Sequence, residues 1–177
     1  MKTSFEKADF ALRVLTFLAL VAGGLWVIYQ YELSGSSDWT NNITVETKVS
    51  PYHDNLRLLV VHVKSKNPRN YMLELDNKLG DSFELRLRKI PMDAKENAVI
   101  DEDEGSVIKN VDLMKDTGGK YEFLPGAEMD DMRTFVLPVN TIVTLSAEIK
   151  MHNGMTNEHG KPDADFVSAS TVVHIEP

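Results

Sequence analysis

The segment from Val14 to Tyr31 contains no charged side chain, and this feature constrains the fold of the chain more than any other. Thr16 and Gln30 are its clear polar residues, so a helix formed by the segment would be apolar on every side. At about 1.5 Å per residue, such a helix spans close to the hydrocarbon core of a bilayer, which is about 30 Å thick. We therefore predict a transmembrane helix at residues 12–31, after a short segment at residues 1–11.

The charges on either side of the apolar segment predict its orientation. Lys2, Lys7 and Arg13 precede or open it, whereas no Lys or Arg follows it before Lys48. Because Lys and Arg concentrate on the cytoplasmic side of membrane proteins, we expect residues 1–11 in the cytoplasm and the rest of the chain outside. The predicted location is a cell inner membrane, with a single-pass topology and a periplasmic C-terminal domain.

Several residues of the predicted helix suit the bilayer and a partner within it. Arg13 can extend its guanidinium to the inner boundary. Aromatic rings favour the membrane–water interface, and the outer end of the helix carries three of them. Small residues let a second helix approach closely, which predicts a helix-packing site and hence a protein partner or a second copy of the chain. The interface residues are Arg13, Trp26, Tyr29 and Tyr31, and the packing residues are Ala19, Gly23 and Gly24.

A cleaved signal peptide is the alternative interpretation of this segment. Leu12–Ala22 would be its apolar region, and Val21 and Gly23 would be poor small-residue determinants of cleavage. Against it, the apolar residues continue through Leu25–Ile28, where a cleaved protein normally turns polar. The mass of the mature N-terminus distinguishes the two interpretations.

After a linker at residues 32–40, the pattern changes to an alternation with a period of two, which is typical of β-strands. Leu56–Val63 is instead apolar on both faces, which predicts a central strand covered on both sides. About seven to nine strands separated by turn residues favour a mainly β domain at residues 41–177, folded as an antiparallel immunoglobulin-like sandwich. The expected strands include Ile43–Val49, Leu56–Val63, Tyr71–Leu75, Phe83–Arg88, Phe135–Val139, Val143–Met151 and Val167–Ile175.

The stretch Val61–Pro68 (VHVKSKNP) resembles the strand followed by Asn-Pro in late-embryogenesis-abundant water-stress domains. Those domains are immunoglobulin-like sandwiches, so the resemblance implies the same fold class. It implies no function.

Ser106–Lys115 is compatible with a short helix inserted in the sandwich. Val107, Ile108, Val111 and Met114 recur at helical spacing, Ser106 is a possible N-cap and Gly118 a possible stop. The segment is otherwise ambiguous.

Composition excludes several classes of function. The net charge is −8 and no dense basic stretch is present, so the chain lacks the electrostatic footprint of a nucleic-acid-binding protein. The absence of cysteine excludes disulfides, thiolate metal ligands and a cysteine nucleophile.

No motif for catalysis or for a cofactor is present. The acidic run Asp101–Gly105 lacks the spacing of a calcium-binding loop and indicates a solvated loop. Asp130 and Asp131 are neighbours on a strand and should point to opposite faces. His62 is expected to be buried or at a sheet edge, His174 has no evident partner, and no serine lies in a nucleophile elbow. Copper-binding side chains are grouped in a predicted loop between the last two strands: Met151, His152, Met155 and His159.

The sequence therefore predicts a non-enzymatic, membrane-anchored accessory or sensor subunit of a membrane complex, without a cofactor or metal. It would act through its transmembrane helix and outer β-domain. The alternative is an extracytoplasmic module that binds a ligand or metal through loops at one end of the sandwich, Met151–Asp165 or Asp93–Gly105.

Overall fold

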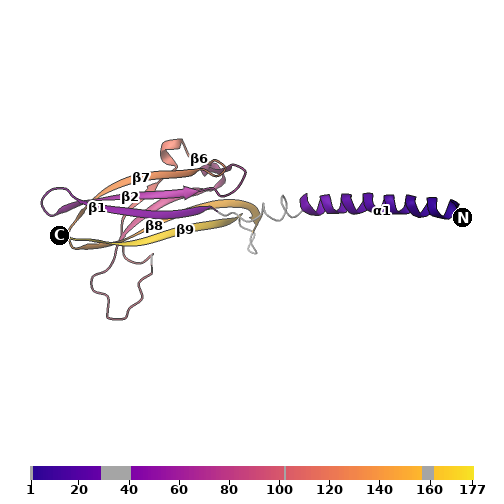
Figure 1. The fold of residues 1–177 in the computed structure, drawn as a ribbon. Helices are drawn as coiled ribbons and strands as arrows, with labels where there is room; N and C mark the ends of the chain where they lie inside the picture. Colours follow the sequence, from indigo (N-terminus) through magenta and orange to yellow (C-terminus); the bar gives the residue numbers. More distant parts are fainter. Residues whose placement is uncertain (1, 29–40, 102, 157–161) are drawn as a thin grey trace. The chain divides into compact units, whose positions relative to one another are not determined.

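The computed structural model describes residues 2–28, 41–101, 103–156 and 162–177. The chain divides into two units, Met1–Trp39 and Thr40–Pro177. In its described residues the first contains one α-helix, and the second is mostly β and antiparallel (Figure 1). We describe each unit by itself.

Helix α1 (Lys2–Ile28) begins within the segment predicted to precede the transmembrane helix. Its part from Ala8 to Ile28 is long and apolar enough to cross a membrane. Arg13 and Asp9, one helical turn apart, form an ion pair with 2.8 Å between Nη2 and Oδ2. The predicted helix end at Tyr31 lies outside the described residues.

A three-stranded antiparallel sheet has the order β1 (Asn42–Pro51), β2 (Leu56–Lys66) and β7 (Glu128–Pro138). The register places Glu46, His62 and Met132 in one row across the sheet. Alternate residues of β2 are fully buried, and those between them are half-buried. The prediction that β2 is central is confirmed. The prediction that both of its faces are covered was wrong, because His62 and Lys64 lie on a face that is partly exposed to solvent.

A four-stranded antiparallel sheet has the order β5 (Ser106–Asp112), β4 (Ser82–Lys89), β8 (Thr141–Thr156) and β9 (Pro162–Ile175). Its central strands β4 and β8 contribute fully buried side chains at every second residue. β1 lies near β9 and β8, so the two sheets adjoin on this side. The buried residues of the central strands are Phe83, Leu85, Leu87, Val143, Leu145, Ala147 and Ile149.

A two-stranded sheet completes the domain and pairs β3 (Leu73–Asp76) with β6 (Lys120–Phe123). A 3-10 turn, η2 (Asn77–Leu79), leads from β3 towards β4, and another, η3 (Lys115–Thr117), precedes β6. Leu73, Leu75, Tyr121 and Phe123 point inward from the two strands and are buried. This small sheet therefore shares its apolar side chains with the core of the domain.

The helical interpretation of Ser106–Lys115 was wrong. Residues Ser106–Asp112 form β5, which pairs with β4, and the helical turn that follows is the short η3. The register shifts between Leu87 and Arg88, so β4 residue Arg88 is opposite Val107 and Leu87 is opposite Lys109. An irregularity of this kind disturbs the alternation of apolar residues that identifies a strand, and here it produced an apparent helical spacing.

The prediction of a loop between the last two strands was also wrong over most of its length. Residues up to Thr156 continue β8, and β9 begins at Pro162. Met151 is opposite Asp165, and His152 is opposite Ala164. Apolar and polar residues do not alternate regularly in this part of the sequence, so its pattern does not identify a strand. Pairing between β8 and β9 nevertheless extends both strands through these residues.

Candidate functional site

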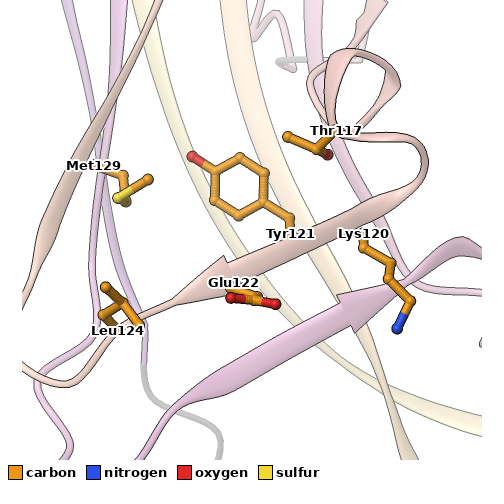
Figure 2. A pocket seen from close by; sticks show the side chains of 6 residues that line it. All are labelled: Thr117, Lys120, Tyr121, Glu122, Leu124 and Met129. Atoms are coloured by element: carbon orange, nitrogen blue, oxygen red, sulfur yellow. The ribbon is translucent and has the colours of Figure 1, made fainter.

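A surface pocket of about 500 Å³ lies beside β6, between η3 and the start of β7. Figure 2 shows the ring of Tyr121 at its centre, with Leu124 and Met129 to one side and Thr117 and Lys120 to the other. Among the described residues, the lining consists of Thr117, Lys120, Tyr121, Glu122, Leu124 and Met129. Apolar surface and both signs of charge therefore meet in one small hollow.

The local sequence explains why β6 begins where it does. Gly118 and Gly119 both have positive φ, 72° and 86°, which side chains other than glycine rarely adopt. Gly118 ends η3, and the carbonyl of Gly119 accepts a hydrogen bond from the Asn77 amide at 2.9 Å. That bond opens the pairing of β6 with β3. The two glycines thus turn the chain so that Lys120 and Tyr121 reach the pocket.

Asn67 fixes the other end of β6. This side chain is fully buried after β2, and its amide nitrogen donates to the carbonyls of Tyr71 at 2.7 Å and Phe123 at 2.9 Å. Its carbonyl oxygen accepts from the Arg69 amide at 3.0 Å, and its backbone carbonyl accepts from the Gly126 amide at 2.9 Å. One asparagine therefore joins the end of β2 to the end of β6 and to the turn before β7.

Tyr121 forms the floor of the pocket. Its ring packs edge-on against Phe83 with 5.4 Å between centroids, and it lies 4.8 Å from the ring of Phe123. Its hydroxyl donates to the carboxylate of Asp131 on β7. Burial raises the pKa of Tyr121 well above its ordinary value of 10, and the bond to Asp131 raises it further. The phenol is therefore a neutral donor at physiological pH.

Charged groups surround the opening. Lys120 Nζ lies 2.6 Å from Glu74 Oε1 and 3.6 Å from Asp76 Oδ2, both on β3. The hydrogen bond to Glu74 raises the pKa of Lys120, which keeps its ammonium charged. The hydrogen bond from the Lys78 amide lowers the pKa of Asp76, which keeps that carboxyl ionised. Glu122 lies directly opposite Glu74 in the β3–β6 register.

These protonation states limit what the pocket can do chemically. A general base needs a pKa near the working pH, whereas Tyr121 and Lys120 both hold their protons more tightly than usual. Within residues 2–28, 41–101, 103–156 and 162–177, no three His, Cys, Asp or Glu side chains are grouped so that they could hold a metal ion. The arrangement is suited to binding through apolar contact and fixed charge.

The residues predicted for membrane contact lie on α1 or beyond it. The side chains of Arg13 and Trp26 are exposed. A β-carbon added to Gly23 or Gly24 would meet no atom within 4 Å. Ala19 lies on the same helix and is exposed. Tyr29 and Tyr31 lie outside the described residues.

Asp130 and Asp131 point to opposite faces of β7, as predicted. Asp130 Oδ2 lies 2.9 Å from His62 Nδ1 on the outer face, and Asp131 bonds to Tyr121 on the inner side. The expectation of a buried or edge position for His62 was wrong, because His62 is on the central strand with 34% of its side chain exposed.

The other candidate residues are dispersed. His152 Nδ1 lies 2.8 Å from the Asp163 carbonyl, Met155 is exposed, and His159 falls outside the described residues. Asp103 of the acidic run is exposed and lies 3.5 Å from Arg88. His174 borders a smaller hollow of about 240 Å³ with Arg57. None of those that the structure describes lines the Tyr121 pocket.

No prediction from the sequence identified the lining of that pocket. The signal was short: after Gly118-Gly119, four residues alternate as Lys120, Tyr121, Glu122 and Phe123. Such a half-buried strand is too brief to distinguish from a turn by periodicity.

Comparisons with known proteins give little further information. The sequence matches no protein-family model, and no curated protein matches it. One solved structure with similarity is the crystal structure of a Bordetella pertussis protein provisionally named ApaA. It is 14% identical, the match covers 78% of this chain and 96% of that chain, and the TM-score is 0.48. None of these comparisons assigns the chain to a family.

Proposed function

We propose that this chain is a membrane-anchored, non-enzymatic binding protein, an accessory or sensor subunit of a membrane complex. In this proposal α1 crosses the membrane and the β-domain binds a protein partner on the far side. The observation that carries it is the stretch Ala8–Ile28, which is long and apolar enough to span a bilayer and is exposed throughout its described side chains. A water-soluble protein would normally cover an apolar surface of this size.

The pocket supports binding in preference to catalysis. Its central hydroxyl is already bonded to Asp131, and its ammonium is already paired with Glu74. Leu124 and Met129 leave apolar surface open beside them. Concave surfaces with apolar walls and a few fixed polar groups are typical binding sites.

The finer features of the fold and location are part of the same proposal. The antiparallel sheets, with alternate side chains buried, are consistent with an immunoglobulin-like sandwich. The distribution of Lys and Arg around α1 favours a cytoplasmic N-terminus and a periplasmic domain in a bacterial inner membrane.

Extraction of the full-length protein in mild detergent, followed by native mass spectrometry, tests this function. We expect the protein in the membrane fraction and in a complex of defined stoichiometry. A variant with Leu18 and Leu20 changed to Arg should leave the membrane fraction, whereas the exposed domain substitution Leu79→Arg should remain in it. A monomer under several extraction conditions contradicts the role as a subunit.

A ligand-binding module is the second candidate, and the Tyr121 pocket favours it more than the predicted loops do. Residues 151–156 and 162–165 are strand and residues 157–161 lie outside the described part, whereas the described residues of Asp93–Gly105 are mostly exposed. A thermal-shift screen of the full-length protein distinguishes this alternative. A stabilising small molecule whose effect disappears in Met129→Ala supports it.

A further inference from the structure

Two strands beside the pocket each have an unpaired edge. β6 pairs with β3, and β7 pairs with β2, but in the described part of the chain neither strand pairs with the other or with a third strand. They follow one another in the sequence, joined by the turn at residues 124–127, and consecutive antiparallel strands with so short a turn usually pair. Here the pocket lies where that pairing would be.

The direction of the free backbone groups follows from the hydrogen bonds at the strand ends. Asn77 donates to Gly119, so by the alternation of an antiparallel ladder Tyr121 and Phe123 bond to β3. Lys120 and Glu122 therefore turn their backbone N–H and C=O groups to the free edge. Both residues line the pocket.

The same reasoning applies to β7. Val139 donates to the Asn55 carbonyl at 2.9 Å and Asn67 donates to the Ala127 carbonyl at 3.3 Å, so odd-numbered residues of β7 bond to β2. The backbone N–H and C=O groups of the even-numbered residues therefore point away from β2, towards the free edge. These residues are Glu128, Asp130, Met132, Thr134 and Val136.

In the described part of the chain, this edge lacks three common protections against strand addition: an internal proline, a lysine and a β-bulge. β7 has 11 residues, its one proline is the last residue, Pro138, and it contains no lysine. The β2–β7 register is regular along its whole length. Proteins normally shield a long edge strand with proline, lysine, bulges or a covering segment, because its free groups are a template for another chain.

The charges beside the edge are complementary to a basic partner. Glu122 and Glu128 have no ion-pair partner in the described part of the chain. Lys120 is already paired with Glu74 and Arg133 with Asp116 at 3.2 Å, whereas Lys66 lies opposite Glu128 in the β2–β7 register. An incoming chain therefore meets the carboxylate of Glu122, which forms no ion pair in the described part of the chain, next to the apolar side chains of Leu124 and Met129.

We propose that the free edge of β7 and the adjoining pocket bind an extended segment of a partner protein, with apolar and basic side chains in alternation. The segment adds a strand to β7, places an apolar side chain between Leu124 and Met129, and places Lys or Arg near Glu122 and Glu128. Main-chain bonds hold such a segment, and pockets for alternate side chains give it specificity. This inference rests on the proposed function, since it names the chemistry of the partner.

A designed peptide tests the proposal on the full-length protein in nanodiscs. The probe alternates valine and lysine over eight residues, and its controls replace lysine with glutamate or carry N-methyl groups on alternate residues. We expect the valine–lysine peptide to slow amide exchange of Asp130 and Met132 at least tenfold and to leave Asp131 and Arg133 unchanged. The two controls should bind at least tenfold more weakly. Unchanged exchange at Asp130 and Met132, or equal binding of the N-methylated peptide, overturns the proposal.

A pair of variants tests the edge from the side of the protein. Thr134→Pro removes an outward N–H without removing a bond to β2, whereas Thr134→Ala retains that N–H. Peptide binding should be lost in the first variant and retained in the second. If the Pro variant does not fold, the comparison of the N-methylated peptide with the unmodified peptide still tests whether the partner adds a strand to β7. Protection of the even-numbered amides by self-association, without peptide, overturns the proposal in favour of a second copy of the chain.

The outcomes separate this inference from the proposed function. If the extracted complex keeps its partner in Thr134→Pro, the β7 edge is not the docking site, and the role as a complex subunit stands. If the protein is monomeric in every extraction, the proposed function itself fails.

Discussion

Strands β8 and β6 of the same domain differ in length and in the number of strands with which they pair. β8 has 16 residues and pairs with β4 on one side and β9 on the other. β6 has four residues and pairs with β3 alone among the described strands. The inner side chains of β8 fill the core between neighbours on both sides, whereas those of β6 reach the core next to an open pocket.

The outer faces differ in the same way. Beside β8, Arg86 bridges Glu84 and Glu148 at 3.1 and 2.9 Å, so charges on that face compensate one another. Beside β6, Glu122 lies opposite Glu74 and only the latter is paired with Lys120. Regions in which the charged and polar groups are paired with one another stabilise a fold. Regions with unpaired charged and polar groups are available for binding. We therefore assign the scaffold to β4 and β8 and the binding site to β6 and β7.

The largest expected effect is in the scaffold. Leu145→Ala removes a fully buried side chain from the centre of β8 and should lower the free energy of unfolding by about 3 kcal/mol. Urea unfolding of the full-length protein in detergent, followed by circular dichroism of the strands, measures it. A loss below about 1 kcal/mol would contradict the assignment of β8 to the scaffold.

Asn67→Ala should have the next largest effect and should act mainly on the site. It leaves the carbonyls of Tyr71 and Phe123 without their donor, at a cost of about 2 kcal/mol. Hydrogen exchange should accelerate in β6 more than in β8. Asn70→Ala, at an exposed position of the same turn, is the matched control and should change neither.

Tyr121→Phe should cost about 1 kcal/mol at pH 7, because Asp131 loses a hydrogen-bond donor. The pH dependence identifies the cause. The pKa of Tyr121 is raised in the folded state, so the unfolded chain releases this proton first as the pH passes 10. The wild-type protein should therefore lose stability above pH 10, and the variant should lack this part of the decline. Urea midpoints from pH 8 to 11 measure the difference; parallel curves would contradict it.

Leu124→Ala should have the smallest effect on stability, within about 0.5 kcal/mol, since the side chain is 52% exposed. Binding of the valine–lysine peptide should nevertheless weaken about tenfold. Leu79→Ala, at a leucine that is 66% exposed and outside the pocket, should change neither quantity. If both variants weakened peptide binding equally, the assignment of the binding site to the Tyr121 pocket would be contradicted.

The sequence predicted the scaffold better than the site. Alternation in Phe83–Arg88 and Val143–Met151 is long and regular, so the mostly β, antiparallel character of the domain and these strands are confirmed. Opposite the register shift between Leu87 and Arg88, the spacing of Val107 and Ile108 is typical of a helix, although these residues form a strand.

The site depends on contacts that no local pattern contains. The bond between Asn67 and Phe123 joins residues 56 positions apart, and the position of β6 beside β7 depends on it. Similarly, Tyr121 meets Asp131 across a turn that leaves their strands unpaired. The alternation of Asp130 and Asp131 was predictable from strand geometry, but the partners of the two carboxylates were not.

The two neighbouring carboxylates of β7 also bear on the fidelity of folding. β7 carries apolar residues on both faces, Phe135 and Leu137 inward and Met132 and Val136 outward, so hydrophobicity alone defines its alignment with β2 weakly. A slip of one position in either direction would leave a carboxylate at one of the two aspartate positions and place Met129 or Met132 at the other, so either His62 or Tyr121 would lose its partner. A nascent β7 that docks one residue out of place therefore loses a carboxylate contact on one of its two faces, which favours return to the native alignment.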